Sequence, residues 1–241
     1  MKPNVSRETK KPSAHPLWSA EQWGAHVPQV VVSVGLEASA HQASQLAGYM
    51  ALLQQWNGTY NLTALRAPAD MLTHHLADCL VVVNPMLSHL GLSMSDAQST
   101  PAARFKVLDV GSGGGLPGVV LAILCPALSV TCVDTVGKKA AFIRQVAAEL
   151  KLPNLRSEHA RVEQLTGQYD LITSRAFASL VDFTGWTAHL LLPGAWWMAM
   201  KGKPSDDEQA ALQTKVSVDA VAPLAVPGLG AERCLVWMKP R

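Results

Sequence analysis

The feature that most constrains the fold is an apolar strand that runs directly into a cluster of glycines. Residues 105–110 have the pattern of a buried strand, and Gly111, Gly113 and Gly115 follow within five positions. Glycine adopts positive φ and lets a ligand approach the backbone closely, and Pro117 suits the first turn of a helix. Strand, glycine turn and helix in this order predict a doubly wound α/β sheet with a ligand beyond the carboxyl end of the strand.

Three interpretations of this turn are open. Residues 109–115 match Asp/Glu-x-Gly-x-Gly-x-Gly, the pattern of S-adenosylmethionine-dependent methyltransferases. Gly113, Gly115 and Gly118 also satisfy Gly-x-Gly-x-x-Gly, and Asp134 lies about 20 residues further on, as a dinucleotide-binding oxidoreductase requires. The third interpretation is a purely structural glycine turn.

Two acidic residues at strand ends bear on this choice. Asp109 stands directly before the glycines, where its carboxylate would repel a pyrophosphate but attract a sulfonium and an ammonium group; the alternative is that it caps the turn. Asp134 ends the next predicted strand and can accept hydrogen bonds from both ribose hydroxyls, unless it is the N-cap of the following helix. Asp109 therefore favours the methyltransferase, whereas Asp134 fits both nucleotide interpretations.

The chain divides into a helical part and a part in which strands and helices alternate. We expect a flexible tail at 1–16, an N-terminal helical extension at 17–92, a linker or loop at 93–104 and a cofactor-binding domain at 105–241. In the extension, helices are predicted at 19–57, ended by Gly58, and at 68–90. In the last part, strands are predicted at 105–110, 128–134, 155–159, 169–174, 194–201, 216–222 and 234–239, and helices from 117 and at 138–150, 180–191 and 206–214.

This alternation predicts a seven-stranded, mostly parallel sheet with helices on both faces. The last two strands have no helix between them, so they pair as a hairpin and leave one strand antiparallel.

Composition narrows the class of protein further. Apolar residues make up 49% and charged residues 16%, so most of the chain can fold around a core. The net charge of +2 does not by itself argue for nucleic acid. The apolar run at 119–125 is far too short for a membrane span, and the polar, basic start is not a signal peptide. We expect a cytoplasmic monomer, independent of membranes. Three of the four cysteines sit in or beside apolar runs, which indicates buried thiols.

Separate sequence blocks, in a fixed order, resemble one family. The blocks are 60–64 (Tyr-Asn-Leu-Thr-Ala), 75–80 (His-Leu-Ala-Asp-Cys-Leu), 108–118 (Leu-Asp-Val-Gly-Ser-Gly-Gly-Gly-Leu-Pro-Gly), 137–139 (Gly-Lys-Lys), 161–163 (Arg-Val-Glu), 174–179 (Ser-Arg-Ala-Phe-Ala-Ser) and 201–203 (Lys-Gly-Lys). The chain resembles the bacterial 16S ribosomal RNA guanine-N7 methyltransferases, also called the glucose-inhibited division protein B family.

The resemblance implies a class I methyltransferase (Rossmann-like) fold, S-adenosylmethionine as cofactor, and methyl transfer to N7 of one guanine in 16S ribosomal RNA of the small subunit. It places cofactor contacts on Gly111, Leu116, Val162, Glu163 and Arg175. With the residues of the glycine turn and strand ends, the candidate cofactor-binding set is Asp109, Gly111, Gly113, Gly115, Leu116, Asp134, Val162, Glu163 and Arg175. The alternatives are an NAD-dependent oxidoreductase and a non-catalytic RNA-binding module on the same fold.

The chemistry of such a transfer makes few demands on side chains. Guanine N7 has a free lone pair, so we expect no general base, no catalytic triad and no metal ion, and alignment supplies most of the rate. His75 and Asp78 have the spacing of a metal pair but no third ligand is evident, so we interpret them as a helix hydrogen-bond pair.

The expected partner is small-subunit ribosomal RNA or an assembled 30S particle. N7 faces a major groove that is too deep and narrow for side chains in A-form RNA, so the target guanine must lie in a loop or be extruded. Phe177 is a candidate for stacking on it, and Arg175 for pairing with the methionine carboxylate or an RNA phosphate. Cations near predicted strand ends mark a candidate RNA path, namely Lys138, Lys139, Arg144, Arg161, Arg175, Lys201 and Lys203.

Overall fold

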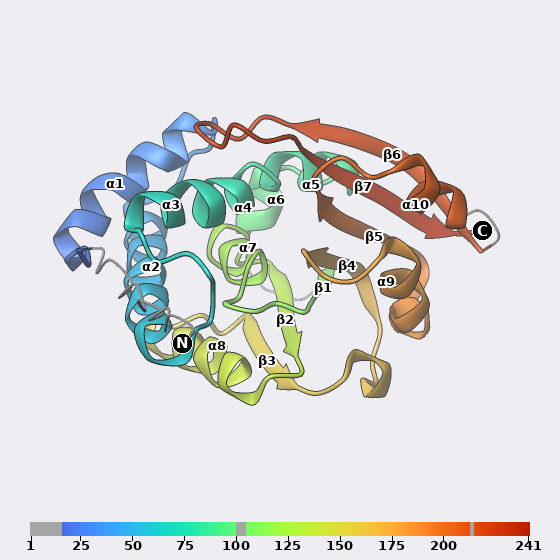
Figure 1. The fold of residues 1–241 in the computed structure, drawn as a ribbon, viewed down its shortest axis with the longest axis horizontal. Helices are drawn as coiled ribbons and strands as arrows, with labels where there is room; N and C mark the ends of the chain where they lie inside the picture. Colours follow the sequence, from blue (N-terminus) through green and yellow to red (C-terminus); the bar gives the residue numbers. More distant parts are fainter. Residues whose placement is uncertain (1–15, 100–104, 213–214) are drawn as a thin grey trace, which may run out of the picture.

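A seven-stranded sheet in the order β3-β2-β1-β4-β5-β7-β6 forms the centre of the computed structural model (Figure 1), which describes residues 16–99, 105–212 and 215–241. The strands are β1 (Phe105–Val110), β2 (Leu128–Asp134), β3 (Leu155–His159), β4 (Tyr169–Arg175), β5 (Leu191–Lys201), β6 (Val216–Leu224) and β7 (Arg233–Pro240). All pairs are parallel except β5–β7 and β6–β7. The predicted seven strands and closing hairpin are confirmed.

Helices cover both faces of this sheet (Figure 1). They are α1 (Ala20–Ser33), α2 (Ala40–Tyr60), α3 (Pro68–Met71), the π-helix η1 (Leu72–Ala77), α4 (Asp78–Leu80), α5 (Val83–His89), α6 (Met94–Gln98), α7 (Gly118–Leu124), α8 (Gly137–Glu149), the 3-10 helix η2 (Val162–Gln164), α9 (Leu180–Thr187), the 3-10 helix η3 (Ala188–Leu190) and α10 (Asp206–Ala211). The last four residues of β1 are buried because both faces of a parallel sheet are covered.

The single helix expected at 19–57 is wrong, because the structure divides it into α1 and α2. Gly35 takes φ +72 after the end of α1, a conformation that stops a helix. Ser39 then starts α2 with a capping box, in which its side chain accepts from the backbone of Gln42. The expected end at Gly58 is also wrong, since α2 continues to Tyr60. A glycine inside a long helix costs only about 1 kcal/mol, which packing offsets.

The interval 93–104 contains α6 and is therefore not only loop. Ser93 caps this short helix, accepting from the backbone of Asp96. Residues 100–104, most of the predicted tail at 1–16, and positions 213–214 of the helix expected at 206–214 lie outside the described residues.

The helical extension shares its hydrophobic core with the sheet. One buried cluster contains Trp23 and Leu53 from the extension together with Val107 and Phe142 from the sheet and α8. The Trp56 ring lies 5.4 Å from that of Phe142. The extension therefore packs as part of the same body that carries the glycine turn. None of the helices described is long and apolar enough to cross a membrane.

Candidate active site

The glycine turn after β1 has the geometry that its sequence predicts. Gly111, Gly113 and Gly115 take φ values of +65, +57 and +88, which favour glycine. The Gly111 amide donates to the Val133 carbonyl at 2.9 Å, which joins the turn to β2. A Cβ atom on Gly111 would lie 2.4 Å from Cδ2 of Phe177. Glycine is therefore required at 111 both for backbone conformation and for the close packing of Phe177.

Asp134 lies at the end of β2 and organises the loops around it. Its Oδ2 accepts from the Gly113 amide at 2.9 Å and its Oδ1 accepts from the Val136 amide at 2.8 Å. The Lys139 ammonium lies 3.8 Å from Oδ2. Each carboxylate oxygen has a further lone pair, so the group that orders the turn can also accept from ribose hydroxyls.

The side chain of Asp109 does not lie where it was predicted, beside the positively charged groups of the cofactor. Its carboxylate lies behind the turn, where Oδ2 accepts from the Gly118 amide at 2.9 Å at the start of α7. The side chain is fully buried, and its Oδ1 has no hydrogen-bond partner among the described residues. Burial raises the pKa of Asp109 to about 7. These contacts match the alternative interpretation, in which Asp109 caps the turn.

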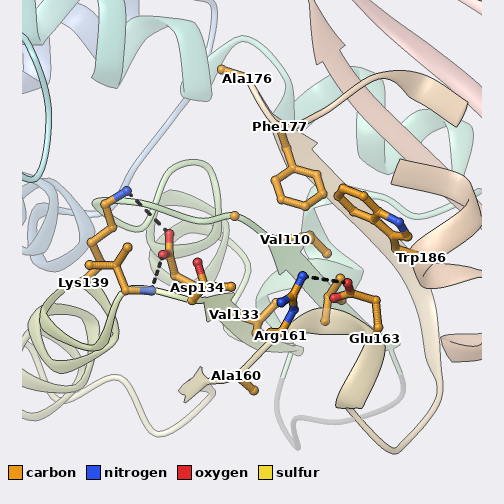
Figure 2. Close-up of a pocket in the computed structure, with 14 residues that line it drawn as sticks. Val110, Val133, Asp134, Lys139, Ala160, Arg161, Glu163, Ala176, Phe177 and Trp186 are labelled. Carbon is orange, nitrogen blue, oxygen red and sulfur yellow. Dashed lines mark hydrogen bonds and ion pairs between the residues drawn. The ribbon is translucent and has the colours of Figure 1, made fainter. Parts of the chain in front are cut away.

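A pocket of about 320 Å³ lies above the carboxyl ends of β1, β2 and β4 (Figure 2). Lys139 and Asp134 occupy one side of it, and Phe177 and Trp186 the other (Figure 2). Arg161 and Glu163 form an ion pair at its rim, 3.6 Å apart. Its lining residues are Val110, Gly111, Val133, Asp134, Thr135, Val136, Lys139, Ala160, Arg161, Val162, Glu163, Ala176, Phe177 and Trp186.

Four of the predicted cofactor residues therefore line the pocket: Gly111, Asp134, Val162 and Glu163. Gly113 and Gly115 shape the turn, whereas Leu116 is buried in the core below it. Trp186 was missed by the sequence interpretation. It lies on α9, and its exposure of 40% is unusual for a tryptophan. The sequence signal for it is that Trp186 lies off the face of α9 formed by Leu180, Phe183 and Thr187, which are buried.

The loop that carries Phe177 is strained. Ala176 and Ala178, on either side of the ring, take φ values of +54 and +21, which are costly for residues with a Cβ atom. Ser179 then caps α9, its hydroxyl oxygen accepting from the Asp182 amide at 3.0 Å. Phe177 and Trp186 meet edge to face at 5.8 Å. The packing of Phe177 on Gly111 and against Trp186 maintains this conformation, and it forms an aromatic wall over the glycine turn.

Arg175 is placed beneath this loop and not in the pocket lining. It donates to Asp78 Oδ2 at 3.1 Å and to the His74 carbonyl at 2.9 Å. Asp78 is 2% exposed, and its Oδ1 accepts from Arg233 at 3.0 Å. One buried carboxylate thus joins the ends of β4 and β7 to the N-terminal helices. Asp78 pairs with these arginines and not with His75, so the expected hydrogen-bond pair between His75 and Asp78 is wrong.

His75 completes this network from the π-helix. Its Nε2 lies 2.6 Å from Thr63 Oγ1, and its Nδ1 lies 3.5 Å from Arg175. Burial, and next the charge of Arg175, lower the pKa of His75 to about 4. The imidazole is therefore neutral at pH 7. Within the described part of the chain, no three or more metal-ligating side chains are grouped to hold a metal ion.

The predicted RNA-binding cations do not form one continuous set. Lys138 and Arg144 are exposed on α8, whereas Lys139 and Arg161 belong to the pocket. Lys201 donates to Glu208 at 2.6 Å, which neutralises it. Lys203 is exposed two residues further on.

The pocket fits the two halves of S-adenosylmethionine. The carboxylate of Asp134 suits the ribose, and the apolar residues Val136, Ala160 and Val162 suit an adenine ring. Gly111 lines the same pocket beside the Phe177 ring, and the absence of a side chain of its own leaves its backbone open to the methionyl part. Sheet order, ligand pocket and glycine turn define a class I methyltransferase with S-adenosylmethionine as its cofactor, as predicted.

Comparison with known proteins identifies the family. Residues 42–236 match the family model GidB, described as rRNA small subunit methyltransferase G. Proteins named Ribosomal RNA small subunit methyltransferase G are 55% identical in Acidovorax sp. (strain JS42), over 86% of this chain and 91% of that protein, and 53% identical in Paracidovorax citrulli (strain AAC00-1), over 87% and 86%. The chain belongs to the rRNA small subunit methyltransferase G family.

Solved structures agree on the fold alone. TrmN from Thermus thermophilus superposes with a TM-score of 0.50 at 15% sequence identity, covering 95% of this chain and 82% of that one. The predicted class I fold is confirmed, the predicted enzyme class is that of the family, and the NAD-dependent oxidoreductase is not favoured.

Proposed function

We propose that the chain transfers a methyl group from S-adenosylmethionine to N7 of a guanine in 16S ribosomal RNA of the small subunit. The observation that carries this proposal is the family match, which spans the glycine turn, the Asp134 pocket and the Phe177 loop together. The substrate RNA lies among ribosomal subunits, so we also propose a cytoplasmic location. The monomeric state stays a prediction.

The side chains around the pocket bind and orient, and none needs to move a proton. S-adenosylmethionine, when bound, would supply a methyl group activated by a positively charged sulfur, and guanine N7 has a free lone pair to accept it. Asp134 would accept from the ribose hydroxyls, and Gly111, which lines the same pocket, would lie beside the methionyl part. Phe177 and Trp186 exclude water from the opposite side and offer ring faces and edges to an extruded purine. Alignment of nucleophile, methyl and sulfur supplies the rate.

The RNA would approach over the carboxyl edge of the sheet. Lys138 and Arg144 are exposed on α8, the helix that carries the pocket residue Lys139, and Lys203 is exposed just after the carboxyl end of β5. These exposed cations suit a phosphate backbone, and their contribution falls with salt.

The test combines deletion with reconstitution. In a strain without the gene, borohydride–aniline cleavage of 16S RNA should lose one site of N7-methylguanine, and purified protein with S-adenosylmethionine should restore it in vitro. Naked 16S RNA and 30S particles, assayed in parallel, identify the form that is methylated. An unchanged cleavage pattern in the deletion strain contradicts the proposal. Purified protein that binds the RNA but does not methylate it would support the RNA-binding module instead.

A further inference from the structure

We propose that a second cavity, between the end of β5 and the β6–β7 hairpin, binds a nucleotide of the RNA substrate that lies near the target guanine. The inference rests on the proposed function and adds a subsite to it. The cavity has a volume of about 280 Å³, just below the roughly 300–1,000 Å³ that is usual for ligand sites, so it would receive one nucleotide and not a longer segment. Its walls include Lys203, Pro204, Val221, Pro223, Glu232 and Arg233.

The position of this cavity suits an RNA chain whose target guanine lies beside the cofactor pocket. β5, β6 and β7 bring it to the same sheet edge at which β1, β2 and β4 form the cofactor pocket. The second cavity is lined from β7 and β6, which are two and three strands from β4 in the sheet order, or about 10 and about 14 Å at the usual strand spacing. This separation is within the reach of neighbouring nucleotides in one strand.

Buried side chains link the walls of the two cavities. Arg233 lines the second cavity and donates to Asp78 Oδ1 at 3.0 Å, while Asp78 Oδ2 accepts from Arg175. Arg175 is followed at once by Ala176 and Phe177, which line the cofactor pocket. The rim of the second cavity and the loop over the first therefore share one buried carboxylate.

The chemistry of the walls matches a nucleotide in both of its parts. Pro223 and Val221 are exposed, Val221 at 40%, and together with buried Pro204 they offer an apolar surface to the face of a base. Lys203 and Arg233 are placed at the same cavity for a phosphate. Lys203 has no ion-pair partner within the described ranges, in contrast to Lys201.

The charge balance also favours an anion. The cavity and the bridge behind it hold three cations, Lys203, Arg233 and Arg175, against two carboxylates, Glu232 and Asp78. The positive charge suits the phosphates of single-stranded RNA, whose bases are unstacked and can be received one at a time, and the apolar wall can cover the face of one base.

The first experiment uses the full-length protein and unmethylated small subunits from a deletion strain. Lys203→Glu and Val221→Glu should each raise the KM for the RNA substrate about five- to tenfold, while kcat and the Kd for S-adenosylmethionine stay within about twofold. Lys215→Glu and Val32→Glu are matched controls, because both residues are exposed and lie away from this edge, before β6 and on α1. Equal KM values in all four variants would overturn the proposal.

The second experiment does not depend on a loss of function. A benzophenone amino acid in place of Val221 should cross-link, on irradiation, to 16S nucleotides within a few positions of the methylated guanine. The same group in place of Val32 should not. Cross-links at distant positions, or none, from a variant that still methylates would overturn the subsite and leave the proposed function intact. Failure of the proposed function is distinct, because the unaltered protein would then not methylate the subunits.

Discussion

Phe177 packs against the backbone of Gly111 so closely that position 111 has no room for a side chain. The nearest ring carbon would lie 2.4 Å from a Cβ atom there, and the glycine has φ +65. The aromatic wall of the pocket and the floor of the cofactor site are therefore one packed unit. A change in either residue should be measurable in the other's function.

Gly111→Ala should weaken S-adenosylmethionine binding about tenfold or more and lower the free energy of unfolding by about 1–3 kcal/mol. The added methyl group must displace Phe177 or distort the turn. Isothermal titration calorimetry and thermal unfolding measure the two effects. Gly58→Ala is the control, since Gly58 lies inside α2 and a Cβ atom there would meet no neighbouring atom within 4 Å. That variant should be neutral or stabilising by up to about 1 kcal/mol.

Asp134→Asn should raise the Kd for S-adenosylmethionine about 10- to 100-fold, because the amide keeps one acceptor oxygen and loses the charge. The variant cannot accept from both Gly113 and Val136, so the turn loses one of its two bonds. Asp170→Asn removes the charge from a carboxylate that accepts from the Lys106 amide at 2.8 Å, away from the pocket. An equal loss of affinity in both variants would contradict a specific role for Asp134.

Asp78→Asn should lower the free energy of unfolding by about 3 kcal/mol, because it leaves Arg175 and Arg233 without a buried counter-charge. Denaturant unfolding measures the change. The comparison is Asp219→Asn, which breaks an exposed pair with Lys239 at 3.5 Å and should cost less than about 1 kcal/mol. Similar costs for the two variants would show that the buried bridge does not stabilise the fold.

Asp109 should make stability fall as the pH rises towards neutrality. Its pKa is raised by burial from 3.8 to about 7, so its contribution is fully present below about pH 4 and is lost as the pH rises through 7. Asp109→Asn has no charge to bury. Its free energy of unfolding relative to the unaltered protein should therefore increase between pH 4 and 7, by at most about 1.4 kcal/mol per pH unit.

The comparison must use the difference in free energy of unfolding between Asp109→Asn and the unaltered protein, because His75 makes stability rise with pH. Its pKa is lowered to about 4, so protonation of the unfolded chain reduces stability as the pH falls below about 6.5. The histidine is common to both proteins and cancels. A difference that is flat from pH 4 to 8 would mean that Asp109 has an ordinary pKa in the folded chain.

Local patterns predicted the sheet well and long-range contacts poorly. The bounds of β1, β2 and β3 match the predicted ones, because β1 ends at Gly111, β2 ends at Asp134, and β3 starts after the turn of Pro153 and Asn154. The break after α1 was missed although Gly35 and the Ser39–Gln42 capping box both mark it. The apolar periodicity from Leu46 to Leu53 belongs to α2 alone and does not extend across Gly35.

In the candidate site, too, residues marked by local sequence patterns were predicted and long-range contacts were not. The pocket residues Gly111, Asp134, Val162 and Glu163 lie next to strand ends, where topology alone brings them together. The bridge from Asp78 to Arg175 and Arg233 joins positions 97 and 155 residues apart, and no local signal encodes such pairs. Asp109 was predicted to contact the cofactor because it directly precedes the glycine turn. Its side chain does not line the pocket and instead accepts from the Gly118 amide at the start of α7.

Tyr49 of α2 donates from its hydroxyl to the Gly114 carbonyl at 2.7 Å, and Leu53 packs where a Cβ atom on Gly114 would lie 2.9 Å from it. The helical extension thus braces the cofactor turn from behind. Since binding stabilises every segment that must unfold with the site, the amides of α2 should exchange with solvent more slowly when S-adenosylmethionine is bound, although α2 lies outside the pocket. Removing the extension would therefore weaken binding of the methyl donor, because the glycine turn would lose its contacts with Tyr49 and Leu53.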